Sequence, residues 1–214
     1  MVANVYADVW VIAETHATKD NELQFDNYVV YQHNRTSNLS KKGSGGIAIA
    51  INNSLFESHE LVKIVRGVDG QIGIKLRNQL NDMQIGVLGL YLSPDSYRFG
   101  QDPEQFFNEA AIIWEDFRDC DLLVGTGDLN ARIRSENDFI EDIDGHIPPR
   151  SNPDSVKNPH GNHFLTFLKG NRAIVLNGSV SRENNNFKFH SPRCRSVPDH
   201  MFCPTDQFSY CKKM

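Results

Sequence analysis

The sequence lacks several features that would assign it to other classes of protein. Its cysteines form no Cys-x-x-Cys pair, and their spacing does not fit a structural zinc site; they are Cys120, Cys194, Cys203 and Cys211. No apolar run is long enough to cross a bilayer, and no secretory signal precedes the first expected strand. We therefore expect an intracellular protein, nuclear or cytoplasmic, with reduced thiols. The net charge of -5 excludes an overall basic surface for nucleic acid.

The length and composition are those of an ordinary globular domain. With 214 residues, 39% hydrophobic and 23% charged, the chain can bury a sizeable core in one domain that spans residues 1–214. Charge is uneven, because acidic residues crowd positions 136–144 while the C-terminal end is basic. A solvated loop is a sufficient explanation for the acidic run.

Apolar patterns predict many strands and few helices. Strands are expected over residues 7–13, 28–31, 46–51, 61–65, 72–76, 83–92, 122–127, 174–177, 187–192 and 197–203. The first of these ranges is continuously apolar, which indicates burial on both faces. Asp102 and Pro103 predict a helix start, followed by an apolar stripe that fits packing on a sheet. A short helix is expected over 164–168, after a long polar loop over 132–157. This order predicts two packed sheets with helices outside.

The stretch 122–131 is the most informative part of the sequence. An apolar run ends in small residues, and a carboxylate and an amide then follow two positions apart as Asp128 and Asn130. If the chain stays extended past Gly127, period-2 geometry places both side chains on one face. Gly125 and Gly127 leave room for a ligand. The pair is suited to holding a metal or a water that attacks phosphorus, although an ordinary loop start gives the same pattern.

Polar residues recur at the ends of other expected strands. Glu14 follows the first strand, Tyr91 precedes a strand-ending proline, and Asp199 lies in the last strand. Taken singly, Glu14 reads as a surface carboxylate and Tyr91 as a core or rim side chain. If these ends converge with Asp128 and Asn130, one pocket holds three carboxylates, which repel one another unless a cation is present. Oxygen ligands favour a hard divalent ion, Mg²⁺ or the related Mn²⁺.

Taken together, the sequence resembles the endonuclease/exonuclease/phosphatase superfamily over nearly its whole length. The matching segments occur in the family's order, and they are residues 13–15, 45–49, 91–94, 127–131, Asn158 with Gly161, 176–178, 189–192 and 196–200. The segments 189–192 and 196–200 most resemble endonuclease domains of animal retroelements and their domesticated relatives. The resemblance implies a four-layered α/β sandwich, with two mostly antiparallel sheets flanked by helices, and a phosphodiester substrate such as DNA.

The resemblance also implies a role for each matched residue. Glu14 and Asp128 would ligate Mg²⁺, and Asp128 would also hold or deprotonate the attacking water. Asn130 would orient that water or the phosphate, and Tyr91 would contact the phosphate. Asp199 would orient a catalytic histidine.

The sequence departs from the family pattern at both ends, so we expect an incomplete sandwich. Family members begin with a strand that carries a metal-binding Asn and end with a Ser-Asp-His segment, and neither is found here. His200 follows Asp199 directly, and adjacent strand residues point to opposite faces, so His200 is a poor substitute. We therefore expect little or no hydrolytic activity. The alternatives are a non-catalytic remnant that binds nucleic acid or protein, and a small-molecule phosphatase of the phosphoinositide type.

Overall fold

The computed structural model describes residues 6–18, 22–35, 45–94, 101–144, 147, 150–179, 189–190 and 195–211. Three strands form a small antiparallel sheet in the order β1-β3-β2, namely β1 (Val9–Ala13), β3 (Ile47–Asn52) and β2 (Tyr28–His33). Two further short strands, β9 (Phe189–His190) and β10 (Arg195–Ser196), pair with each other. The other residues of the strand predicted over 187–192 lie outside the described part of the chain.

The larger sheet has six strands in the order β4-β5-β6-β7-β11-β8. Their bounds are β4 (His59–Arg66), β5 (Gln71–Asn78), β6 (Gln84–Tyr91), β7 (Leu122–Asp128), β11 (Asp199–Pro204) and β8 (Ala173–Val175). Strands β6 and β7 are parallel, and every other pair is antiparallel. The chain links β6 to β7 through helix α1 (Pro103–Asp116), because parallel neighbours need a crossover connection.

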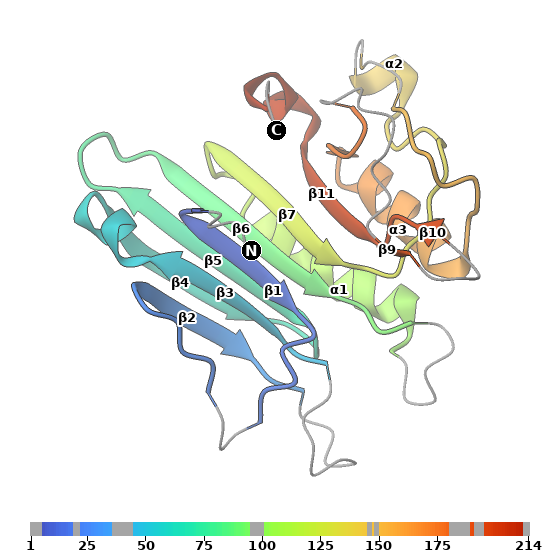
Figure 1. The fold of residues 1–214 in the computed structure, drawn as a ribbon. Coiled ribbons are helices and arrows are strands. Elements are labelled where there is room, and N and C mark those ends of the chain that lie inside the picture. Colours follow the sequence, from blue (N-terminus) through green and yellow to red (C-terminus); the bar gives the residue numbers. More distant parts are fainter. Residues whose placement is uncertain are drawn as a thin grey trace.

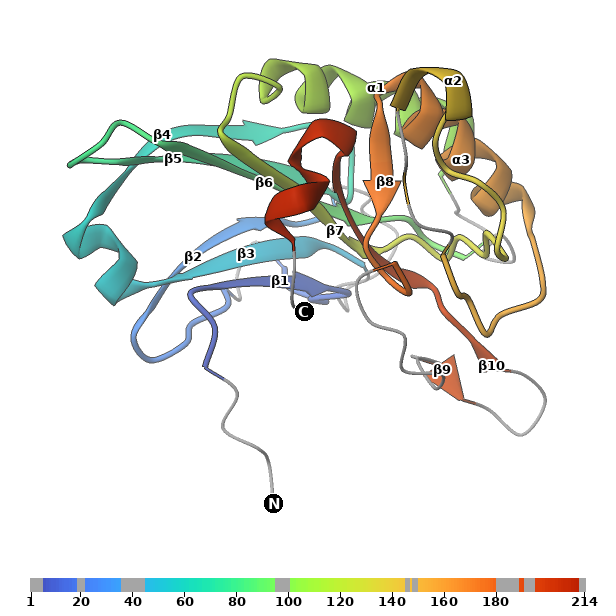
Figure 2. The same ribbon diagram turned by 90° about the horizontal axis from the view of Figure 1, so that it is seen from above.

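The two sheets and the helices form layers, as Figure 2 shows. Helices α1 and α3 (Pro159–Gly170) cover one face of the six-stranded sheet, and the three-stranded sheet covers the other. One core lies between helices and sheet, with Trp114, Phe164 and Phe202 at its centre, and a second core lies between the sheets around Ile49 and Ile74. The predicted α/β sandwich of two mostly antiparallel sheets with helices is confirmed. Within the described residues, no helix covers the outer face of the three-stranded sheet.

Helix α1 begins where the sequence predicted. The side chain of Asp102 accepts a hydrogen bond from the backbone N–H of Glu104, and Pro103 occupies the first helical position. The predicted apolar stripe is buried; its members are Phe106, Phe107, Ala110, Ile113, Trp114 and Phe117. Burying a large apolar side chain contributes about 1.5–3 kcal/mol, so this stripe anchors the helix that links β6 to β7. No described helix is both long and apolar enough to span a membrane.

The structure corrects two predictions about local elements. Strand β1 was expected to be buried on both faces but is only half-buried, because it is an edge strand that pairs with β3 alone among the described strands. The helix predicted over 164–168 is longer and begins at Pro159, because the Asn158 side chain caps it by accepting from the N–H of Gly161 at 2.8 Å.

The segment 132–157, predicted as a long loop, contains the short helix α2 (Glu141–Asp144) and is tied down at several points. Ile133 and Lys157 pair as an isolated β-bridge. Arg132 donates two hydrogen bonds to the buried Asp154, at 2.8 and 2.7 Å. These contacts tie the two ends of the segment to each other beside the end of β7, since Arg132 follows β7 by only a few residues.

Candidate functional site at the edge of the two sheets

Strands β1, β6 and β7 end, and strand β11 begins, at the same edge of the sandwich (Figure 1). Tyr91, the last residue of β6, is paired with Asp128, the last residue of the parallel strand β7. On the other side of β7, Asp199 opens the antiparallel strand β11 and is also paired with Asp128. Three residues singled out from sequence therefore lie side by side in the six-stranded sheet, with Asp128 in the middle.

Glu14 reaches the same edge from the three-stranded sheet. It directly follows β1, and the Tyr91 hydroxyl donates a 2.8 Å hydrogen bond to its Oε1. Its backbone is left-handed, with φ of 52°, and the adjoining turn is fixed by hydrogen bonds from the backbone N–H groups of Thr15 and His16 to the carbonyls of Gly46 and Gly45. A non-glycine residue in this conformation is uncommon and is often found at functional sites. The Tyr91–Glu14 contact thus joins the two sheets at this edge.

Asn130 lies beside Asp128, but not in the way the sequence predicted. Strand β7 ends at Asp128, and Asn130 is left-handed with φ of 47°, so period-2 geometry does not relate the two side chains. Instead, the backbone N–H of Asn130 donates to Asp128 Oδ1 at 3.0 Å, and Asn130 Nδ2 donates to the carbonyl of Leu92 at 2.9 Å. Asn130 therefore orients the Asp128 carboxylate and ties the end of β7 to the end of β6.

Gly127 permits the close approach of β6 and β7 at this point. Its φ is +151°, and a Cβ there would stand 1.8 Å from the carbonyl oxygen of Leu90. Any side chain would push the strands apart just before Tyr91 and Asp128. The sequence analysis expected this glycine to make room for a ligand; in the structure the group that approaches Gly127 is the backbone of the neighbouring strand β6.

The charges at this edge perturb the titrating groups. Burial, together with the neighbouring Asp199 and Glu14 carboxylates, raises the pKa of Asp128 to about 6, although the hydrogen bond from the Asn130 N–H acts in the opposite direction. Burial, the hydrogen bond to Glu14 and the charge of Asp128 also raise the pKa of Tyr91 well above its ordinary value. The phenol is therefore a neutral hydrogen-bond donor at physiological pH, and Asp128 is a carboxyl that titrates close to neutrality.

Two other residues lie at the edge: Arg35, which the sequence analysis missed, and Asn158, which it matched to the family pattern without assigning a role. Arg35 follows β2 by two residues, and its charge opposes the increase in the pKa of Tyr91. Asn158 donates from Nδ2 to the carbonyl of Asn130 at 2.8 Å while its Oδ1 caps α3. The Asn-Pro pair at 158–159 was a local signal for the helix start, whereas nothing near Arg35 in the sequence marks its place in the fold.

Comparison with solved structures identifies the architecture. The AP endonuclease of Leishmania major superposes with a TM-score of 0.68 at 14% identity, over 95% of this chain and 71% of that one. NExo from Neisseria meningitidis, described as a 3′-5′ exonuclease, gives 0.63 at 14% identity over 97% and 80%. An endonuclease/exonuclease/phosphatase family protein from Leptotrichia buccalis gives 0.51 at 10% identity over 92% and 74%. The chain has the endonuclease/exonuclease/phosphatase fold. Neither the family models nor the curated sequences match it.

His200 does not join the acidic edge of this endonuclease/exonuclease/phosphatase fold. It is buried on the helix-facing side of β11, where its ring packs on Phe164 with centroids 5.1 Å apart and its Nε2 lies 2.7 Å from the carbonyl oxygen of Ala131. Burial lowers its pKa to about 4, which keeps the ring neutral. The prediction that His200 points away from Asp199 is confirmed, since Asp199 is exposed.

The donors at the edge suit a hard divalent cation. Among the described residues, no three His, Cys, Asp or Glu side chains form a ready-made metal cluster. Mg²⁺ does not need one, because it usually keeps several waters and binds through one or two carboxylates together with substrate phosphates. Glu14 and Asp128 offer two carboxylates beside Tyr91. Burial raises the pKa of Asp128 first, and the Asp199 and Glu14 charges, which a cation would offset, raise it further. The residues present therefore fit Mg²⁺ or Mn²⁺.

Proposed function

We propose that this protein hydrolyses phosphodiesters in a reaction that depends on Mg²⁺ or Mn²⁺, with DNA as the first substrate to test. The observation that carries the proposal is the meeting of four residues at one edge, where the Tyr91 hydroxyl donates to Glu14 and Asp128 is paired with Tyr91 on one side and with Asp199 on the other. Nucleases with this fold support it, as does a structure of NExo, there described as a 3′ phosphatase, bound to a product DNA hairpin. The resemblance to retroelement endonucleases makes double-stranded DNA the preferred form.

In the proposed reaction each residue has a distinct role. A water oxygen attacks phosphorus, the bond to the leaving ester oxygen breaks, and the water proton passes to the Asp128 carboxylate as general base. When substrate is bound, the Tyr91 hydroxyl turns from Glu14 Oε1 and donates its one hydrogen bond to a phosphate oxygen as charge develops there. Asn130 holds the Asp128 carboxylate in place through its N–H. A divalent ion held by Glu14 and Asp128 would supply Lewis-acid stabilisation of the phosphate oxygens.

We further propose that turnover is slow. His200 faces the helices, so Asp199 does not orient it toward the phosphate, and His200 does not protonate the leaving oxygen. Removing a general acid or base commonly costs 10²–10⁴-fold in rate. A protein that binds DNA without cutting it is the competing outcome, and it predicts salt-dependent binding with no strand cleavage.

A plasmid-nicking assay tests the proposal. Wild-type protein is expected to convert supercoiled plasmid to nicked circles with Mg²⁺ or Mn²⁺ and not with EDTA. Glu14→Gln and Asp128→Asn are expected to reduce the rate by roughly 10²-fold or more. Glu57→Gln is the matched control. Glu57 is exposed in the 3-10 helix Asn53–Glu57, which follows the end of β3 that lies away from the acidic edge.

Two results would count against the proposal. Nicking that survives both substitutions would mean that the activity comes from elsewhere. Absence of nicking at high protein concentration, together with DNA binding, would establish the binding protein instead.

A further inference from the structure

Arg35 is a cation placed beside an otherwise acidic edge. Its side chain is only 10% exposed, and its Nε lies 3.9 Å from Asp69 Oδ2 in the loop between β4 and β5. It is also close enough to Tyr91 for its positive charge to act on the phenol. Because it is largely enclosed, its interaction with an anion is screened less than that of a surface arginine.

The approach of Arg35 to Tyr91 depends on Gly45. This glycine has a φ of +65°, and a Cβ there would stand 3.0 Å from Tyr91 Cε1 and 3.6 Å from Arg35 Cδ. The missing side chain therefore lets the aromatic ring and the arginine stem approach the same point. This packing fixes the direction of the arginine stem without using its guanidinium group.

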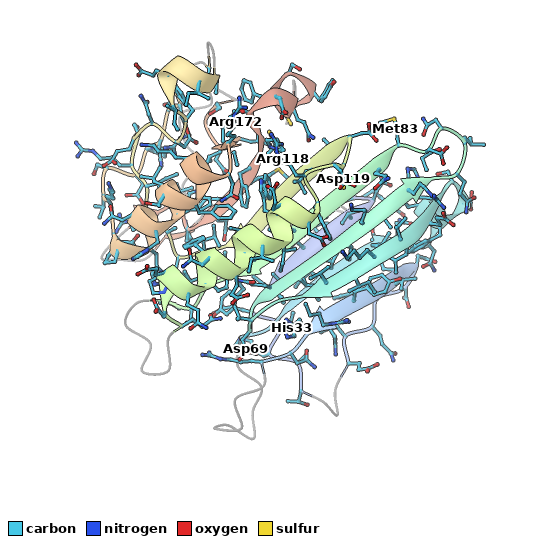
Figure 3. The ribbon with its side chains drawn as sticks, turned by 180° about the vertical axis from the view of Figure 1, so that it is seen from behind. His33, Asp69, Met83, Arg118, Asp119 and Arg172 are labelled. Carbon is cyan, nitrogen blue, oxygen red and sulfur yellow. The ribbon has the colours of Figure 1, made fainter. Side chains whose placement is uncertain are left out.

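The loop that carries Asp69 is joined to the same edge. The carbonyl of Gly70 accepts a 2.7 Å hydrogen bond from the N–H of Tyr91, and Gln101 Nε2 donates to the carbonyl of Asp69. Figure 3 shows Asp69 beside His33 at one end of the molecule, where the ends of β2 and of the β4–β5 loop meet. Asp69 is thus held in register with Tyr91 and can orient the arginine.

A hollow of about 460 Å³ opens next to Asp69, which is enough for one nucleoside. Its polar lining comes from Asp69, Asp102, Gln101, Gln105 and His33. The two carboxylates disfavour a phosphate inside the hollow, whereas the amides and the imidazole can hydrogen-bond to the edge of a base. Arg35 lies close to Asp69 of this hollow at its Nε and close to Gly45, which Tyr91 also approaches, along its stem.

We infer that Arg35 binds a non-reacting phosphate next to the scissile linkage of a bound DNA strand, with Asp69 as its positioning residue and the adjoining nucleoside in the hollow. This inference rests on the proposed function, because Tyr91 marks the scissile phosphate. A guanidinium group suits this role, since it can donate two parallel hydrogen bonds to a phosphate. It also offsets repulsion between DNA and the three carboxylates.

Salt-dependent binding is the first test. Anisotropy of a labelled duplex oligonucleotide, measured with Ca²⁺ in place of Mg²⁺ over a range of salt concentrations, reports the number of phosphates neutralised. Arg35→Gln is expected to lower affinity roughly 10- to 100-fold and to reduce the salt slope by about 0.9. Arg35→Lys should restore the slope but only part of the affinity. Arg66→Gln is the matched control, because Arg66 is exposed on β4 and donates from Nε to the carbonyl of Gln32.

A second test locates the phosphate. Duplexes carrying one neutral methylphosphonate at each position in turn are bound to wild-type protein and to Arg35→Gln. At one linkage beside the scissile one, the methylphosphonate should weaken wild-type binding and leave the variant unaffected. The inference would be overturned if, at every linkage, the methylphosphonate lowered the affinity of Arg35→Gln as much as that of the wild-type protein. An unchanged salt slope in a folded Arg35→Gln protein would overturn it too.

The two proposals fail in different ways. DNA binding that depends on Arg35, without any hydrolysis by the wild-type protein, would remove the proposed reaction and leave the phosphate contact standing. If the wild-type protein hydrolyses DNA and Arg35→Gln does so equally well, the proposed reaction stands and the phosphate contact is wrong. If the wild-type protein fails to bind DNA, both are wrong.

Discussion

Replacing Asp128 by Asn should make the metal-free protein more stable and less active. The native structure raises the pKa of this carboxyl from 3.8 to about 6, chiefly because it is buried and also because Asp199 and Glu14 are nearby. Folding therefore opposes the ionised form. Asn has the same shape and keeps an oxygen that accepts from the N–H of Asn130, so the substitution removes the charge with little change in packing.

The magnitude follows from the shift in pKa. A shift of roughly 2 units corresponds to about 3 kcal/mol, at about 1.4 kcal/mol per unit. The native state binds more protons than the unfolded state between about pH 4 and pH 6, so the contribution of Asp128 to stability is intact below this window and falls as pH rises through it. Because the side chain is partly exposed, we expect a gain of about 1–3 kcal/mol for Asp128→Asn at about pH 8 and almost none near pH 4.

Urea unfolding in EDTA at both pH values measures this difference. The exposed Asp26→Asn is the control and should change the unfolding free energy by less than about 0.5 kcal/mol at either pH. Adding Mg²⁺ at about ten times its Kd should stabilise the wild-type protein by about 1.4 kcal/mol and the Asp128→Asn variant by much less. A variant that is less stable at the higher pH, or equally stabilised at both, would mean that the buried Asp128 charge does not destabilise the native state.

Three further predictions concern neighbouring features. Tyr91→Phe removes the hydroxyl that donates to Glu14 and should lower the hydrolysis rate by roughly 10²-fold in a folded protein, which single-turnover assays would check. Gly127→Ala should destabilise the fold by roughly 3 kcal/mol or more in urea unfolding, because its Cβ would clash with the backbone of β6 at 1.8 Å. The thiols of Cys203 and Cys211 lie 4.0 Å apart, so hydrogen peroxide should oxidise them to a disulfide and itself be reduced to water. Intact mass should fall by about 2 Da, and stability should rise by at most about 2–3 kcal/mol.

The sequence located most of the site because strand ends are marked by chemistry. Glu14, Tyr91, Asp128 and Asp199 each interrupt or end an apolar run. The pairing of β6, β7 and β11 brings the last three together, and the Tyr91 hydrogen bond joins Glu14 to them. Their convergence could be inferred from the resemblance and from the general position of functional groups at strand termini. The helix stripe was equally predictable, since its spacing alone defines a buried face.

The features that were missed depend on tertiary structure. The half-buried state of β1 follows from its place at a sheet edge, which its apolar sequence does not encode. The left-handed backbone at Asn130 is selected by contacts with Leu92 and Asp128, and so the period-2 argument fails there. Arg35 gains its position only when the ends of β2 and β6 meet around Gly45.

The central claim is that Glu14 and Asp128 together hold one divalent ion, and Mn²⁺ binding followed by electron paramagnetic resonance tests it most directly. The wild-type protein should bind close to one Mn²⁺ that Mg²⁺ displaces, Glu14→Gln and Asp128→Asn should each weaken this binding by roughly tenfold or more, and Glu57→Gln should bind as the wild type does. Mn²⁺ binding that is undiminished in both variants, or absent from the wild-type protein, would contradict the account.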